Sequence, residues 1–90
     1  MVNKQFFIYG RVQGVGFRFT TWREAQKLGL SGFVKNREDG SVEVVVRADL
    51  STLEKLRSWL QVGPRAAKVN KIVEQDYKGE IQLTDFSIKH

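Results

Sequence analysis

The chain has 90 residues, of which 41% are hydrophobic, enough for one hydrophobic core, and we expect a single domain over residues 1–90. It contains no cysteine, which excludes disulfide bonds, thiolate metal sites and a thiol nucleophile. The formal net charge of +5 favours anionic partners: phosphorylated metabolites, nucleic acid or acidic lipid headgroups.

The N-terminal region predicts a cytoplasmic protein without a membrane segment. Its apolar run extends only from Phe6 to Tyr9. That is far shorter than a signal-peptide core or the roughly 20 residues of a membrane span.

A strand and a glycine-rich loop come first. Aromatic and β-branched residues fill residues 5–10 (QFFIYG), which is typical of a strand. Glycines then interrupt the pattern at Gly10, Gly14 and Gly16. They predict a loop directly after the strand.

A helix should follow this loop. Apolar residues recur at helical spacing at Trp22, Ala25 and Leu28. Thr21 and Glu24 have the spacing of a capping box, while a start near Phe17 stays open. Gly29 supplies the stop signal.

The middle of the chain predicts a β-hairpin. Residues 32–37 and 42–47 are strand-like, and Asp39-Gly40 between them is a strong turn signal. The acidic pair Glu38 and Asp39 should be solvated and shape the turn, with no metal role.

A second amphipathic helix follows the hairpin. Its apolar positions are Leu53, Leu56 and Leu60. Ser51 and Glu54 have capping-box spacing, and Gly63-Pro64 should close the helix. A strand over residues 69–76, a polar turn around Lys78 and Gly79, and a short strand over residues 86–89 complete the prediction.

This order of elements predicts an α+β fold: a ferredoxin-like split βαβ sandwich. An antiparallel sheet should carry two helices on one face and a short extra C-terminal strand. By strand direction, the C-terminus should return to the sheet end that carries the glycine loop, where its α-carboxylate can pair with Arg18. The fold itself hosts many functions.

The segment from Gly10 to Arg18 (GRVQGVGFR) has the composition of a phosphate cradle. A glycine-rich turn between strand and helix can aim backbone N–H groups at an anion, and an arginine adds a fork of donors. Neither the P-loop nor the GxGxxG pattern is complete, which argues against a nucleotide site. On these residues alone, a simple tight connection with a surface arginine remains the alternative.

Two sequence blocks resemble the acylphosphatase family. The first consists of Ile8, Gly10, Val12, Gln13, Gly14, Val15, Phe17 and Arg18. The second consists of Gly32, Phe33, Val34, Lys35, Asn36, Gly40 and Val42. The likeness continues through Gly63, Pro64, Ala67 and Val69 to Phe86 and Ile88. One departure is Ala48, where the second block usually carries glycine.

The resemblance implies a hydrolase that cleaves the carboxyl–phosphate bond of acyl phosphates by direct attack of water, without metal, cofactor or covalent intermediate. It implies that the substrate phosphate is bound by Arg11, Val12, Gln13, Gly14, Val15, Gly16, Phe17 and Arg18. Arg18 and Asn36 are then the catalytic residues, and Asn36 positions the water. Small acyl phosphates and inorganic phosphate are the implied partners, and we expect a monomer.

The chemistry suits these residue types. A carboxylate leaving group has a conjugate-acid pKa of about 4 and departs without a general acid. Asparagine is too weak a base to take a proton, so we expect the bound phosphate to accept it. His90, the only histidine, receives no role because terminal residues are usually frayed and solvated.

Two other functions compete with hydrolysis. A basic sheet with Phe7, Tyr9 and Phe33 can stack nucleic-acid bases, but residues 42–46 lack the aromatic side chains of an RNA-recognition strand, so we expect no nucleic-acid partner. The other is a carbamoyl-phosphate-handling domain, since acylphosphatase-like modules also begin larger hydrogenase-maturation proteins, which are far longer than 90 residues.

Overall fold

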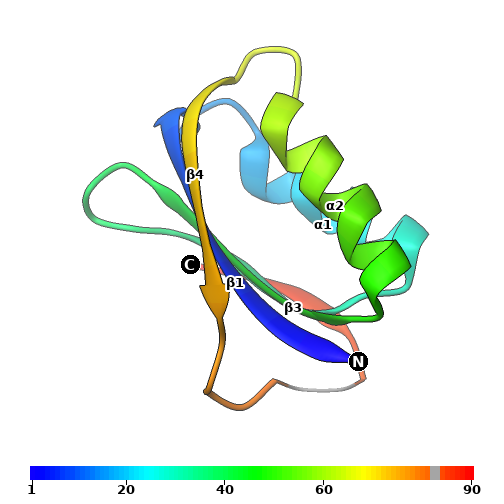
Figure 1. Cartoon of the computed structure of the whole chain (residues 1–90). Coiled ribbons are helices and arrows are strands. Elements are labelled where there is room, and N and C mark those ends of the chain that lie inside the picture. Colours follow the sequence, from blue (N-terminus) through cyan, green and yellow to red (C-terminus); the bar gives the residue numbers. More distant parts are fainter. Residues whose placement is uncertain (82–83) are drawn as a thin grey trace.

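One five-stranded sheet with two helices on one face forms the framework (Figure 1). The computed structural model describes residues 1–81 and 84–90. The elements are β1 (Val2–Arg11), α1 (Phe17–Leu28), β2 (Ser31–Asn36), β3 (Val42–Ala48), α2 (Leu50–Val62), β4 (Lys68–Asp76) and β5 (Phe86–Lys89). The predicted α+β ferredoxin-like fold, with its extra C-terminal strand, is confirmed.

Strand directions decide which strand ends lie together at one edge of the sheet. The strand order is β4-β1-β3-β2-β5. β1 is antiparallel to β3 and β4, and β2 is antiparallel to β3. The β2–β5 pair is parallel, so the sheet is not antiparallel throughout. Consequently β1, β2 and β5 all end at the same edge of the sheet.

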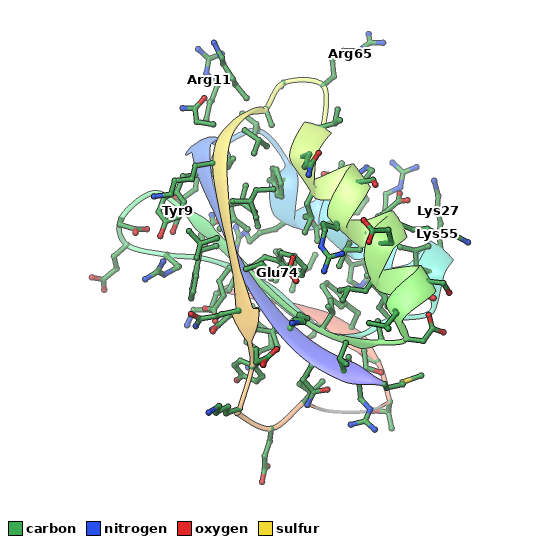
Figure 2. All side chains as sticks on the ribbon, in the orientation of Figure 1. Tyr9, Arg11, Lys27, Lys55, Arg65 and Glu74 are labelled. Carbon is green, nitrogen blue, oxygen red and sulfur yellow. The ribbon has the colours of Figure 1, made fainter. Side chains whose placement is uncertain are left out.

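The core lies between the sheet and the helices. Alternate strand residues face the helices, which is the two-residue period of a half-covered sheet. The largest fully buried side chains on this face are Phe6, Ile8, Val12, Phe17, Val34, Val42, Val44, Leu53, Leu56, Leu60 and Phe86, whereas the equally buried Val45 lies on the opposite face, in register with Gln5 and Phe33. On the opposite face Phe7, Tyr9 and Phe33 are half-buried, and Figure 2 shows Tyr9 on the side away from the helices.

The two predicted capping boxes are wrong. α1 begins at Phe17 after Gly16, so Thr21 lies inside the helix and is fully buried. α2 is capped by Asp49, whose carboxylate accepts a hydrogen bond from the Thr52 amide at 2.8 Å. The extended backbone of Asp49 after β3 places its side chain over the first helical turn, which puts Ser51 inside the helix.

Other predicted boundaries hold closely. Gly29 and Gly63 end the two helices, and the terminal strand covers the predicted residues 86–89. β1 is longer than predicted because its polar N-terminal half pairs with β3 from Val2 opposite Ala48. Ala48 itself is buried and in regular register, so the missing glycine leaves the strand undisturbed.

A two-point ion pair fastens α2 to β4. Arg57 Nε and Nη2 each lie 2.7 Å from an oxygen of Glu74, which sits between the strand and the helices (Figure 2). Hydrogen bonds from Arg57 lower the pKa of Glu74, and the charges of Arg57 and Lys4 act in the same direction. Arg57 also contacts Glu54 at 2.8 Å within α2.

Glu74→Gln tests this pair. At pH 7 we expect its free energy of unfolding to fall by about 1 kcal/mol, because the pair is charge-assisted but only partly buried. The pKa of Glu74 is lowered in the folded chain, so its stabilisation is complete above the usual value of 4.5 and is lost as the pH falls through the lowered value. Urea unfolding at pH 7 and pH 3 measures the loss of stability in the variant and its decrease in acid.

Glu54→Gln is the matched control, since it removes the more exposed carboxylate that contacts the same arginine. Its effect should be small at either pH. An equal loss for the two variants, or a Glu74→Gln deficit that does not shrink in acid, would contradict the assignment.

Candidate active site

A hollow of about 280 Å³ opens at the sheet edge where β1, β2 and β5 end. It is lined by Val12, Gly14, Gly16, Phe17, Arg18, Phe19, Asn36, Ile88 and His90. Its volume is near the lower limit of about 300 Å³ that is usual for small-molecule sites. The hollow therefore suits a small ligand.

The loop between β1 and α1 turns through left-handed backbone at Gly14 (φ 74°) and Gly16 (φ 77°). A Cβ atom at either position would meet nothing within 4 Å, so the backbone conformation and not crowding favours glycine there. Gly16 at the N-cap has no side chain to cap α1, no other side chain among the described residues does so, and the first turn holds no acidic residue. The amides of that turn, with the helix dipole behind them, thus suit an anion in the hollow.

Gln13 ties this loop to the β2–β3 hairpin. Its Nε2 donates to the main-chain oxygens of Arg37 at 2.8 Å and Ser41 at 2.9 Å. The side chain therefore points away from the hollow, and any contact of Gln13 with an anion must come from its backbone.

Phe17 ties the other end of the loop to α2. Its buried ring lies 5.9 Å from the ring of Trp59. At Gly63 a Cβ would come within 2.7 Å of the Phe17 ring, so that close approach requires glycine. The end of α2 thereby fixes where α1 begins.

The C-terminal residues contact Arg18, as the strand directions predict. Its Nη1 donates to the main-chain oxygen of Lys89 at 3.0 Å and lies 3.3 Å from Nδ1 of His90. None of the salt bridges among residues 1–81 and 84–90 involves Arg18, and its pairing with the α-carboxylate stays a prediction. His90 is exposed, as expected of a terminal residue, but it also belongs to the lining of the hollow.

Asn36 is the last residue of β2 and lines the same hollow. Its Oδ1 is buried, and within the described part of the chain it has no hydrogen-bond partner. A buried acceptor of this kind normally has a partner, but this oxygen has almost no surface open to water, so a water molecule in the hollow can donate to it only after the side chain turns. Asn36 therefore has a free acceptor beside the hollow that a turn of its side chain would bring to a water molecule.

The structure gathers only some of the predicted phosphate-binding residues around the hollow. Val12, Gly14, Gly16, Phe17 and Arg18 line it. Arg11, Gln13 and Val15 are not part of its lining. The Arg11 side chain is exposed and extends beyond the end of β1 (Figure 2).

Sequence reasoning missed three lining residues: Phe19, Ile88 and His90. A usable signal existed for Phe19, which is apolar, follows Arg18 directly and lies off the buried stripe of α1. Strand direction placed the C-terminus near the loop, but it did not indicate which side chains would reach it.

A second, more polar hollow adjoins the first and shares Asn36 and His90 with it. Its acidic members include Asp39, whose carboxylate accepts hydrogen bonds from the Ser41 hydroxyl at 2.5 Å and the Ser41 amide at 2.9 Å. These bonds lower the pKa of Asp39. Asp39 thus shapes the hairpin turn, as expected.

Within residues 1–81 and 84–90 the structure holds neither a cluster of metal ligands nor a membrane-spanning helix. No three or more His, Cys, Asp or Glu side chains gather there closely enough to hold a metal ion. Neither α1 nor α2 is long and apolar enough to cross a membrane.

Fold and loop together define a class: a ferredoxin-like α+β domain with a glycine-rich loop between its first strand and first helix. The acylphosphatase family model matches residues 4–88. The acylphosphatase of Pasteurella multocida (strain Pm70) is 49% identical over 90 residues, and the match covers 100% of both chains. The chain belongs to the acylphosphatase family and is a hydrolase.

Solved structures agree. The crystal structure of acylphosphatase from Bacillus subtilis matches with a TM-score of 0.93 and 34% identity over 100% of both chains. Full-length HypF in its phosphate- and nucleotide-bound form matches with a TM-score of 0.85 and 25% identity. That match covers 99% of this chain and 12% of HypF.

Gln13→Ala tests the attachment of the loop. It removes two hydrogen bonds to the hairpin, each worth about 0.5–1.5 kcal/mol, so the free energy of unfolding should fall by about 1–2 kcal/mol. Phosphate binding should weaken as well, because the loop amides are held less rigidly. Urea unfolding and calorimetric phosphate titration measure the two effects.

Gln75→Ala serves as the control, since this exposed glutamine also donates one side-chain hydrogen bond, to Gln5, on the far side of the sheet. If Gln13→Ala matched this control in both stability and phosphate affinity, the attachment would be irrelevant to the site.

Proposed function

We propose that this chain hydrolyses acyl phosphates by direct attack of water at phosphorus, without a metal or a covalent intermediate. One observation carries the proposal: Arg18, the start of α1 and Asn36, whose Oδ1 has no hydrogen-bond partner among the described residues, all belong to the lining of one hollow. Arg18 and the start of α1 suit a phosphoryl anion, and Asn36 suits a water molecule beside it.

In this proposal the phosphoryl group lies against the backbone amides of the loop from Arg11 to Arg18. The Arg18 guanidinium exchanges the Lys89 carbonyl for phosphoryl oxygens, which are better acceptors because they are charged. These donors stabilise the charge that spreads over the phosphoryl oxygens during transfer.

The attacking water is held by Asn36 Oδ1, in line with the bond that breaks. A bond forms between the water oxygen and phosphorus, and the bond between phosphorus and the acyl oxygen breaks. The carboxylate leaves with the electron pair, and a phosphoryl oxygen accepts the proton from water. Because the leaving carboxylate is a weak base, with a conjugate-acid pKa of about 4, no general acid is required.

The contacts of the open sheet face favour hydrolysis over nucleic-acid binding. A cation lies over each aromatic ring: Arg37 over Phe7 (4.4 Å), Lys71 over Tyr9 (5.8 Å) and Lys89 over Phe33 (4.3 Å). A base stacking on these rings would have to displace the cations, so we propose small acyl phosphates and inorganic phosphate as the partners. The monomeric state, the single domain and the cytoplasmic location stay predictions.

The direct test is hydrolysis of benzoyl phosphate by the purified chain in the presence of a chelator. We expect turnover far above the spontaneous rate, because the proposed mechanism uses only protein groups. A rate no faster than the uncatalysed reaction would reject the proposal, and strict dependence on an added metal would reject its mechanism.

Arg18→Ala and Asn36→Ala should differ in whether they lose phosphate affinity as well as turnover. Arg18→Ala should lose phosphate affinity and almost all turnover, since a charge-assisted hydrogen bond worth roughly 1.5–3 kcal/mol disappears. Arg18→Lys should rescue it poorly, because lysine lacks the planar fork. Asn36→Ala should keep its phosphate affinity while turnover falls about a hundredfold, since its role follows binding.

Calorimetric phosphate titration beside turnover measurements separates these outcomes. Arg65→Ala and Asn70→Ala are matched controls, both exposed and outside the hollow. The division of roles is wrong if Asn36→Ala retains full turnover, or if it loses phosphate affinity as severely as Arg18→Ala.

A further inference from the structure

Phe19 is an aromatic residue on the rim of the hollow. It follows Arg18 in the first turn of α1, it lines the hollow, and 54% of its surface is exposed. The buried stripe of α1 consists of Phe17, Thr21 and Ala25, so Phe19 contributes nothing to the core. Its exposure is therefore not explained by packing of the fold.

Neighbouring side chains support the Phe19 ring. The ring stacks on Trp22, with centroids 6.1 Å apart and planes at 24°, and the Arg23 guanidinium lies 5.9 Å from its centroid. A ring supported in this way loses little freedom when a ligand binds against it, which favours binding. The other exposed apolar side chains on helices, Leu50 and Val62, lie on α2 and do not line the hollow.

The hollow has one polar and one apolar part. Gly14, Gly16, Arg18 and Asn36 supply backbone and polar side chains, whereas Phe19 and the half-buried Ile88 supply apolar surface. A hollow of about 280 Å³ has the volume of several water molecules at roughly 30 Å³ each, more than the phosphorus and three oxygens of a phosphoryl group need. Room remains for part of the acyl group.

The geometry of displacement suggests where that acyl group lies. In an in-line reaction the acyl oxygen leaves on the side of phosphorus opposite the attacking water. Asn36, which would hold the water, comes from strand β2, whereas Phe19 comes from helix α1 in the other layer. Because Asn36 and Phe19 come from different layers, the acyl group can contact Phe19 while the water is held by Asn36.

We propose that Phe19 binds the acyl group and selects acyl phosphates with an aromatic or other flat apolar acyl group over those with a small one such as acetyl. This inference rests on the proposed function for its substrates. Phe19 contacts the acyl ring through the part of its own ring that Trp22 and Arg23 leave open, and Ile88 covers a further part of it. The phosphoryl end remains with the loop and Arg18.

Binding of two phosphonates tests this subsite without any reaction. Benzylphosphonate and methylphosphonate share the anionic end and differ in the ring. Calorimetry on the intact chain should show tighter binding of benzylphosphonate. Phe19→Ala should reduce that preference about three- to tenfold, the range of an aromatic contact worth about 0.7–1.4 kcal/mol.

Phe19→Leu, which keeps apolar volume without the ring, should fall between Phe19→Ala and the natural chain, and it guards against a folding defect in the alanine variant. Leu50→Ala, a control at another exposed apolar helix residue, should retain the preference. The kcat/KM ratio of benzoyl phosphate to acetyl phosphate should fall in parallel with the phosphonate preference.

The outcomes distinguish this subsite from the proposed function. If Phe19→Ala keeps the phosphonate preference, or weakens both phosphonates equally, the subsite is wrong even if hydrolysis is observed. If the preference depends on Phe19 but neither acyl phosphate is hydrolysed, the subsite stands as an aromatic-binding surface and the proposed hydrolysis is rejected.

Discussion

The common direction of β1, β2 and β5 is the constraint on which the site depends. Each strand ends at the same sheet edge and delivers a different part: β1 the glycine loop, β2 Asn36, and β5 the C-terminal residues that meet Arg18. Reversing any one of these strands would move the loop or residues that follow from its end to the opposite edge of the sheet. The parallel β2–β5 pair is what brings His90 to a residue 72 positions earlier in the chain.

The loop is fixed from both sides of the molecule. Gln13 binds it to the hairpin through two main-chain oxygens, and Phe17 anchors it against the end of α2. Donors held in this way need little reorganisation when an anion binds, and such preorganisation is the chief source of electrostatic catalysis. The hairpin therefore supports the site even though most of its residues lie outside the hollow.

The partners of Arg18 suit an exchangeable cation. In the structure its guanidinium contacts a neutral carbonyl and an imidazole ring, and none of the salt bridges among the described residues involves it. A carboxylate partner would compete with a phosphoryl group for the same donors, whereas a carbonyl competes weakly. Four other basic residues form ion pairs with carboxylates among the described residues, as in Arg57–Glu74.

Local sequence signals determined much of the fold. Residue periodicity gave both helices and the five strands, and the Asp39-Gly40 pair gave the hairpin, because these features depend on neighbours within a few residues. The family resemblance identified Arg18 and Asn36, which the structure brings to one hollow. The two capping boxes failed for different reasons: α1 begins after Gly16, which has no side chain, and α2 is capped by Asp49, which lies two residues before the predicted Ser51.

The sequence by itself thus determined the order of elements, the glycine loop and the two candidate catalytic residues. The tertiary structure alone decided that Gln13 faces the hairpin, that Arg11 points away from the hollow, and that Phe19 and His90 line it. The physical reason is distance along the chain. Contacts such as that of Arg18 with Lys89 join residues 71 positions apart, and they exist only once the whole sheet has set the position of each strand.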